Sequence, residues 1–169
     1  HKLIGARTFI SSGNGSAPGA APVSPIDGNG HGTHTPSTAA GSAVPGAQVL
    51  GQGNGTASGI APRAHLAMYK VCDASGACAG VDVLAGIDAA VSDGCDVISM
   101  SLGFPPRPFY NDSVAIGTFA AVEKGIFVSM AAGNGGPRNS SILNEAPWVL
   151  TVAAGTMDRL FSAKVILAD

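Results

Sequence analysis

Apolar residues along this chain gather in short runs, and segments rich in glycine, proline and serine separate these runs. Short apolar runs that are bounded by turn-forming residues are typical of β-strands. The runs predict strands over residues 1–10, 64–71, 96–103, 125–134 and 146–154.

Three other segments have the spacing or the composition of helices, namely residues 31–42, 81–93 and 113–124. Gly94 and Gly125 follow the last two, and a helix commonly ends on a glycine in the left-handed conformation. Residues 11–30 and 51–59 are rich in small, turn-forming residues, and we predict that both are loops.

The predicted strands are almost continuously apolar, and helices separate most of them. This pattern indicates an α/β fold, in which a mostly parallel sheet carries helices on both faces. In such folds a ligand binds beyond the carboxyl ends of the strands. The segments DGNGHGTHT, SMSLG and SMAAGNGG, which lie at strand ends or helix starts, are therefore the places to look for chemistry.

Composition narrows the class of protein further. The 169 residues are 46% hydrophobic and only 12% charged, so the chain is not of the disordered kind. The net charge of −2 comes without a basic cluster, which argues against a nucleic-acid partner. No apolar run approaches the roughly 18 residues that cross a membrane. The chain begins at His1, and we expect it to be part of a longer protein.

Cysteines and glycosylation sequons bear on the compartment. Cys72 and Cys78 bound a short loop, which favours a local disulfide, with two free thiols and a zinc half-site as alternatives. Cys95 precedes an apolar strand, as a small buried residue would. Together the sequons favour a secreted, extracellular glycoprotein. Their asparagines are Asn14, Asn54, Asn111 and Asn139.

The first of the three segments places His31 between two glycines at a predicted helix start. An imidazole titrates near neutrality, so His31 is a candidate general acid or base, although a cap or packing role is the simpler alternative. His31, His34 and Asp27 also have a spacing that permits a metal site, but no downstream cluster of ligands supports one, and we predict no metal.

The other two segments lie at strand ends. The Asn134 amide, between glycines, has donors for a developing oxyanion, although an Asn-Gly turn is an equal alternative. The backbone of Ser101, Leu102 and Gly103 is suited to accept an extended peptide, although it is also an ordinary strand end.

The combination of these segments is more specific than any one of them. DGNGHGTHTPSTAAGS, VISMSLG and SMAAGNGGP, in that order, resemble the subtilase (subtilisin-like serine protease) family. IAPRAHLAMYKVC, DSVAIGTFAAVEKGIFVS and APWVLTVAAGTMDR are similar to the plant branch of that family. The resemblance covers nearly the whole chain, and it implies a subtilisin-like fold.

The resemblance also implies roles for individual residues. His31 would be the base of the catalytic triad, His34 a structural residue of the same helix, and Asn134 the side chain of the oxyanion hole. Ser101, Leu102 and Gly103 would form one edge of the substrate cleft, and Ala131, Ala132 and Gly133 its other wall, around the residue that precedes the scissile bond. Cys72 and Cys78 match a cysteine pair of plant members.

Two parts of the triad are not found. Asp27 is the only acidic residue before His31, and it matches the polar residue before the histidine motif rather than the triad Asp. The Gly-Thr-Ser-Met-Ala motif of the nucleophile does not occur, and Ser129, in a similar tripeptide, lies inside a predicted strand. In subtilisin, loss of the Ser or the His lowers turnover about a millionfold. We therefore expect residues 1–169 to be the central portion of a peptidase domain and to be inactive alone.

Pro36 departs from the family pattern inside the predicted histidine helix. It removes one backbone hydrogen bond, so the helix is expected either to kink or to begin later. For function, the leading hypothesis is a secreted serine endopeptidase that acts on peptides or proteins without a cofactor, completed by the remainder of the same chain. The alternative is a non-catalytic peptide-binding or inhibitory protein on the same scaffold.

Overall fold

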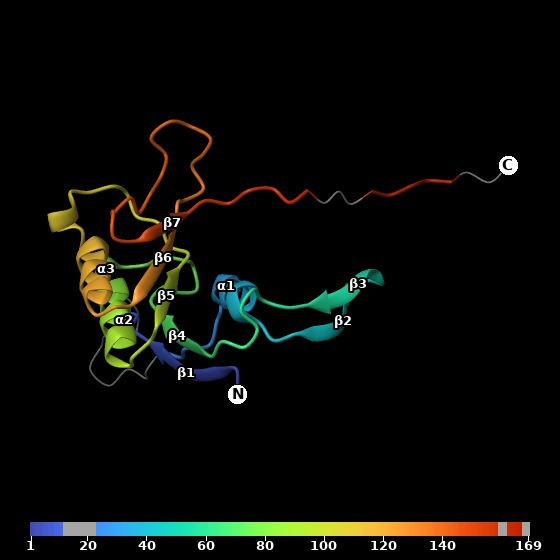
Figure 1. Ribbon diagram of the computed structural model, residues 1–169, viewed down its shortest axis with the longest axis horizontal. Coiled ribbons are helices and arrows are strands. Elements are labelled where there is room, and N and C mark those ends of the chain that lie inside the picture. The colour runs from blue at the N-terminus through green and yellow to red at the C-terminus, as the bar shows by residue number, and fades with distance from the viewer. Residues whose placement is uncertain (12–22, 159–161, 167–169) are drawn as a thin grey trace.

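We describe the protein from a computed structural model, which describes residues 1–11, 23–158 and 162–166. Helices are interspersed with the strands along the chain, and helices lie on both sides of the strands (Figure 1). Within the described residues, no helix combines the length and the apolar character that crossing a membrane requires.

The predicted helices and strands occur in the predicted order, with shorter bounds at several ends, and two further strands over residues 44–49 and 52–57 were not predicted. The strands are β1 Leu3–Thr8, β2 Val44–Val49, β3 Gln52–Ala57, β4 Leu66–Lys70, β5 Val97–Met100, β6 Phe127–Ala131 and β7 Leu150–Val152. The helices are α1 His31–Ala40, α2 Gly80–Ser92 and α3 Ser113–Glu123, with a short 3₁₀ turn, η2, at Phe109–Asn111. Gly94 and Gly125 follow α2 and α3 in the left-handed conformation, at φ 76° and 83°, as predicted.

Most of the strands pair in parallel, which confirms the predicted α/β class. β1 pairs with β4, and β5, β6 and β7 form a second parallel sheet with β6 in the middle. In this sheet Met100 is in register with Met130, so β5 and β6 end side by side. The segments that follow the two strands therefore start at one edge of the sheet, where parallel α/β folds bind ligands.

The hydrophobic core lies between the second sheet and the helices α2 and α3. Ile98, Val128 and Met130 point from one face of the sheet into this core, where they meet Val83 of α2 and Ala121 of α3. All five side chains are buried. α2 and α3 pack on each other, α3 also packs on β6, and α2 also packs on β4.

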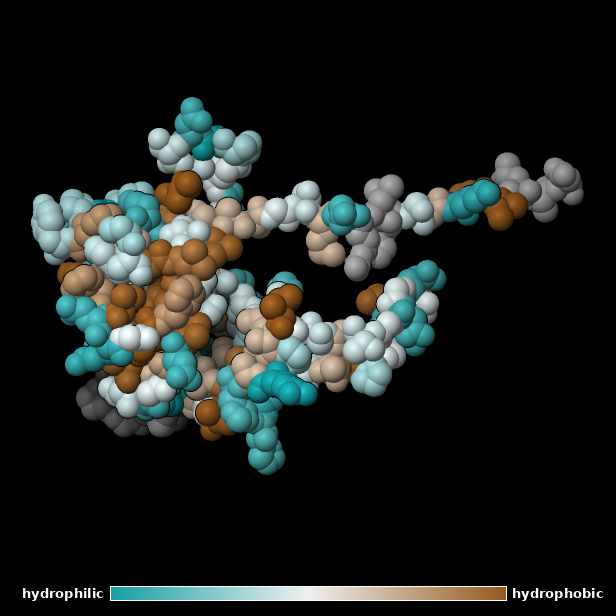
Figure 2. Space-filling view, viewed as in Figure 1, coloured by the Kyte–Doolittle hydropathy of each residue, from teal (hydrophilic) through white to brown (hydrophobic). Residues whose placement is uncertain are grey.

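The opposite face of the same sheet is open in the described residues. Val97 and Phe127 are in register and are 58% and 53% exposed, and Leu150 of β7 is 52% exposed. Figure 2 shows hydrophobic residues at the surface of the part of the molecule that contains α2, α3 and the second sheet. Strands this apolar are normally buried on both faces, and here α1 lies on that side without covering these three residues.

One prediction of a loop is wrong. Residues 51–59 include strand β3, which pairs with β2 as an antiparallel hairpin that projects from the body (Figure 1). Leu50 and Gly51 form its turn, and both have positive φ, 50° and 79°. A two-residue turn of this kind matches the twist of paired strands, so the hairpin forms although its strands are rich in glycine.

Helix α1 begins at His31 and continues through Pro36 to Ala40. A later start, one of the two consequences expected of Pro36, is therefore wrong. Pro36 has no N–H to donate, but both ends of this helix are tied to other segments. At its C-terminal end, the N–H groups of Gly59, Ile60 and Ala61 donate to helix carbonyls or to the capping Gly41.

Candidate active site

His31 is the first residue of α1, and its side chain is exposed. Gly30, which precedes it, has φ 97°, a left-handed conformation that glycine adopts without steric cost. The chain therefore turns sharply into the helix at Gly30, and the exposed imidazole of His31 lies at the N-terminal end of α1. This placement is compatible with a general base that reaches a substrate.

The carboxylate of Asp27 fixes this turn. Its Oδ1 accepts from the backbone N–H of Asn29 and Gly30 at 2.9 and 2.8 Å. Its Oδ2 accepts from the N–H and the hydroxyl of Thr33 at 2.7 and 2.6 Å. The Thr33 hydroxyl above all, and then these backbone donors, hold the pKa of Asp27 far below its usual range. Asp27 thus caps the start of the histidine helix.

Asn29 connects the same turn to the disulfide loop. Its side-chain amide donates to the carbonyl of Ala74 at 3.1 Å, and its Oδ1 accepts weakly from the N–H of His31 at 3.4 Å. Cys72 and Cys78 are bonded, which confirms the disulfide expected from their spacing. The loop that they close therefore lies directly beside the turn that carries His31.

A second aspartate organises the disulfide loop itself. Oδ1 of Asp73 accepts from the hydroxyl and the N–H of Ser75 at 2.6 and 2.8 Å, and from the N–H of Ala77 at 3.1 Å. The Ser75 hydroxyl is the main cause of a lowered pKa at Asp73. An aspartate thus organises each of the two turns that Asn29 connects.

The two predicted walls of the substrate cleft lie at neighbouring strand ends. Ser101–Gly103 follow β5, and Ala132 and Gly133 follow β6, whose last residue is Ala131. Gly133 has φ 86°, so the chain turns there, and the side chain of the next residue, Asn134, is exposed. The structure thus brings the walls together and places Asn134 beside them. His31 belongs to another element, α1, which packs against β4.

Leu143 and Asn144 also contact both walls, and sequence reasoning did not single them out. The amide of Asn144 donates to the carbonyls of Leu102 and Ala131, both at 2.7 Å. The only signal in the sequence is a weak one, since asparagine tolerates the left-handed conformation that residue 144 adopts, at φ 56°.

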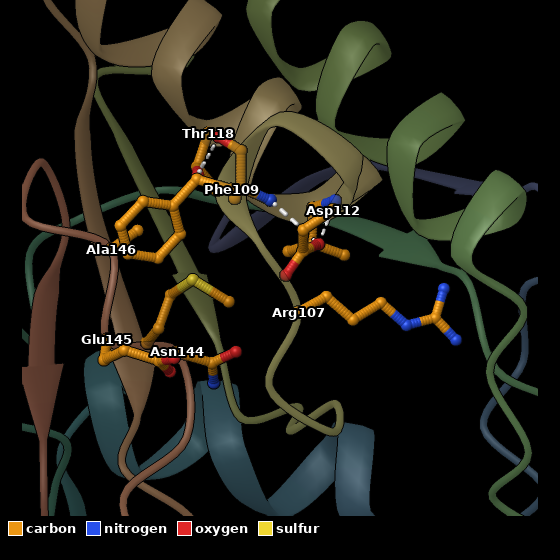
Figure 3. A pocket seen from close by; sticks show the side chains of 10 residues that line it. Arg107, Phe109, Asp112, Thr118, Asn144, Glu145 and Ala146 are labelled. Atoms are coloured by element: carbon orange, nitrogen blue, oxygen red, sulfur yellow. Dashed lines mark hydrogen bonds between the residues drawn. The ribbon is translucent and has the colours of Figure 1, made fainter.

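A small pocket lies beyond Asn144, between α3 and β6 (Figure 3). Arg107 and Asp112 lie toward one side, and Asn144, Glu145 and Ala146 toward the other. Its volume is about 20 Å³, close to what one water molecule needs. None of the residues assigned to catalysis or to the cleft walls lines it, so it is not the predicted cleft.

A larger cavity, of about 200 Å³, lies between the end of the disulfide loop and the segment that follows β5. It is large enough for a peptide side chain rather than for a whole ligand. The residues that line it are Cys78, Gly80, Phe104, Pro105, Arg107, Asp112, Ser113 and Val114. Because Phe104 lines it, this cavity is next to the predicted wall of Ser101–Gly103.

Comparison with known proteins decides the family. The family model for "Subtilase family" matches residues 8–164. The chain belongs to the subtilase family. It is 54% identical to "Subtilisin-like protease SBT1.7" of Arabidopsis thaliana over 175 aligned positions, which cover 99% of this chain and 23% of that protein. It is 53% identical to "Subtilisin-like protease SBT1.2" and to "Subtilisin-like protease SBT5.3" of the same plant, again over 99% of the chain.

This subtilase chain thus spans less than a quarter of the length of these relatives. Of its sequons, Asn54, Asn111 and Asn139 are exposed, whereas Asn14 lies outside the described residues. Within the described part of the chain, no group of three or more His, Cys, Asp or Glu side chains is arranged to hold a metal ion. Both oxygens of Asp27 accept hydrogen bonds from its own turn.

Proposed function

We propose that this chain is the central portion of the catalytic domain of a secreted serine endopeptidase. In the parent protein His31 removes the proton from the nucleophilic serine as it attacks the peptide carbonyl, and later gives it to the leaving amine. The Asn134 amide donates to the oxyanion of the tetrahedral intermediate. The serine and the triad Asp come from segments of the parent outside residues 1–169.

One observation carries this proposal. In a member of the subtilase family, the histidine of the matching motif is exposed at the first residue of a helix, on a turn that a carboxylate fixes. A general base must be accessible and held in place; His31 is exposed, and the hydrogen bonds of Asp27 hold the backbone turn that carries it. The adjacent strand ends of β5 and β6 offer backbone groups to an extended peptide.

The sheets support the view that further segments complete the domain. In the described residues β4 pairs only with β1 and β5 only with β6, so each has a free edge. A free edge presents unpaired backbone groups to another strand. The open apolar face of Val97, Phe127 and Leu150 also offers a surface to cover. We propose that the strand with the triad Asp pairs with one of these edges.

Secretion is proposed on two grounds. Disulfides such as Cys72–Cys78 persist in oxidising compartments, and they are rare in reducing ones. Three sequon asparagines, Asn54, Asn111 and Asn139, are exposed and thus accessible to glycosylation. The intact mass before and after enzymatic deglycosylation tests this part, since a parent without any mass change would contradict it.

Covalent labelling with an active-site phosphonate tests the catalytic part. The parent should be labelled at one serine, and His31→Ala should abolish labelling because the serine then loses its base. His65→Ala is the matched control, since this histidine is also exposed but lies outside the histidine motif and its helix. Residues 1–169 alone should not be labelled.

Two results would contradict the proposal. Labelling of any serine in residues 1–169 alone would show that the chain has its own nucleophile. A parent that is not labelled, but still binds peptides, would favour the non-catalytic alternative.

A further inference from the structure

The turn that carries His31 is connected to another part of the chain as well as closed on itself. The hydrogen bonds of Asp27 all lie within residues 27–33, so they fix the shape of the turn. They do not fix its position relative to the rest of the protein. Two further contacts do so, and both lead to the end of β4 and the disulfide loop that follows it.

Asn29 makes the first of these contacts. Its side-chain amide donates to the carbonyl of Ala74, and its Oδ1 accepts from the N–H of His31. One exposed side chain therefore bridges the disulfide loop and the first residue of the histidine helix. The two segments also lie close together, since a Cβ added to Gly28 would be 3.5 Å from Cβ of Ala74.

Lys70, the last residue of β4, makes the second contact. Its ammonium group donates to the carbonyls of Ser24 and Ile26, at 3.2 and 2.6 Å, just before the turn begins. Lys70 and Ala74 lie on either side of Cys72 in the sequence. Both contacts therefore depend on where the stretch of chain around this cysteine is held.

The disulfide loop is fixed at its two ends and from within. Cys72 follows β4, and Cys78 lies shortly before α2, so these two elements hold the bonded cysteines. Inside the loop, the N–H of Asp73 donates to the carbonyl of Ala77 at 3.0 Å, and the Asp73 carboxylate accepts from Ser75 and Ala77. A closed loop has fewer conformations than an open one, so it holds the Ala74 carbonyl in place.

We propose that Asn29 is a positioning residue for His31, and that the disulfide loop is its anchor. This inference rests on the proposed function, in which His31 takes the proton of the nucleophilic serine. In this role Asn29 touches no reacting atom, and it keeps the backbone of His31 at a fixed place relative to β4 and α2. A misplacement of about 1 Å can lower a rate about 100-fold, so such an anchor bears on turnover.

Asn29→Ala in the parent protease tests the positioning role. It deletes the donor to Ala74 and the acceptor for the His31 N–H. A neutral hydrogen bond changes an equilibrium constant by about 2- to 12-fold, and we expect kcat on one peptide substrate to fall by a factor in this range. KM should change less than about twofold, because the proposed peptide-binding strand ends of β5 and β6 are untouched.

Gly28→Ala is the matched control for the turn. Its added Cβ would make an ordinary contact with Ala74 at 3.5 Å, and the substitution deletes no side-chain hydrogen bond. Gly28 also does not have positive φ, so alanine fits its backbone. This variant should keep the kcat and the KM of the parent.

Loosening the loop tests the anchor. Asp73→Ala deletes the acceptor that organises the loop and leaves the disulfide intact. It should lower kcat when Asn29 is present, and lower it much less in Asn29→Ala, where the link to the turn is already broken. The loss in the double variant should be smaller than the product of the two single losses, by at least about twofold. Two independent structural defects would multiply instead.

The inference and the proposed function fail in different ways. An unchanged kcat in Asn29→Ala, or an equal fall in Gly28→Ala, would overturn the positioning role in a parent that is still labelled and active. An Asp73→Ala variant without effect, or losses that multiply, would show that the disulfide loop is not the anchor. If the parent is neither labelled by the phosphonate nor able to cleave the peptide, the proposed function itself fails.

Discussion

Replacement of Gly59 by alanine should loosen the helix that carries His31. Gly59 is buried, and a Cβ at this position would lie 2.3 Å from the nitrogen of Gly41 and 2.6 Å from the nitrogen of Ala40. Both are backbone atoms, which cannot rotate away as the end of a side chain can. Since φ of Gly59 is not positive, the contact itself is the main cost of the substitution.

The size of the effect follows from the hydrogen bonds that this contact would break. The N–H groups of Gly59, Ile60 and Ala61 donate to the carbonyls of Gly41, Thr38 and Ala39 at 2.9, 3.1 and 2.9 Å. These bonds satisfy carbonyls that the end of a helix otherwise leaves unpaired. Each contributes about 0.5–1.5 kcal/mol net, so their loss should cost about 2–4 kcal/mol of local stability.

Other contacts of α1 would compensate only in part. Ala40 is the only residue of this helix that is buried, so little apolar packing holds the helix in place. A short isolated helix is only marginally stable in water, and thus α1 depends on the segments tied to its two ends. Loosening its C-terminal end should therefore also reduce the order at His31.

Hydrogen–deuterium exchange of the parent protease measures this prediction, because it reports local opening of α1 rather than global unfolding. Amides of residues 37–42 should exchange about 30-fold faster or more in Gly59→Ala, which corresponds to at least about 2 kcal/mol. The phosphonate labelling rate should fall with it. Gly55→Ala is the matched control, since the nearest atom to a Cβ there lies 4.0 Å away. Equal exchange in the two variants would refute the steric argument.

Three further predictions concern acid, thiols and the core. The pKa of Asp27 is lowered from 3.8, so its carboxylate stabilises the histidine turn fully above about pH 4, and this stabilisation is lost as the pH falls further. Hydrogen exchange of α1 should therefore accelerate in acid. In Asp27→Asn the exchange of α1 should depend less on pH. Among the three cysteines, only Cys95 should react with a thiol reagent before reduction; reaction of a second would contradict the bonded pair Cys72–Cys78. Thr118→Val should cost about 1–2 kcal/mol in thermal unfolding, because the indole of Trp148 loses its acceptor at 3.1 Å, whereas an unchanged midpoint would show that the bond contributes nothing.

The sequence predicted strands and helices well where a local signal is strong, such as an apolar run or a glycine after a helix. Apolar runs placed β4, β5 and β6, and Gly94 and Gly125 marked the ends of α2 and α3. It failed at the β2–β3 hairpin, because the glycines that indicate a loop are compatible with strands once a partner strand supplies the hydrogen bonds. At Pro36 the sequence left a kink and a later start as alternatives, and the structure excludes the later start, since α1 begins at His31.

In the candidate site, too, local motifs could be read from the sequence, whereas contacts between distant residues could not. The sequence supplied the hypotheses for His31 and for the walls at Ser101–Gly103 and Ala131–Gly133, because the motifs that carry the resemblance are local; the roles of these residues stay predictions. The contacts of Leu143 and Asn144 could not be predicted, because they join residues about 10 to 40 positions apart in the chain. No local pattern records which carbonyls an asparagine will reach.

By itself, the sequence determined the family of this protein, its α/β class and the histidine that we propose as base, because motifs and hydrophobic periodicity are properties of neighbouring residues. Only the tertiary structure decided that Asp27 caps the helix of His31, that Asn29 docks its turn on the disulfide loop, and that Leu143 lies between two glycines. The physical reason is that hydrogen bonds and close packing depend on distances in space. The folded sheet sets these distances when it brings the ends of β5 and β6 together.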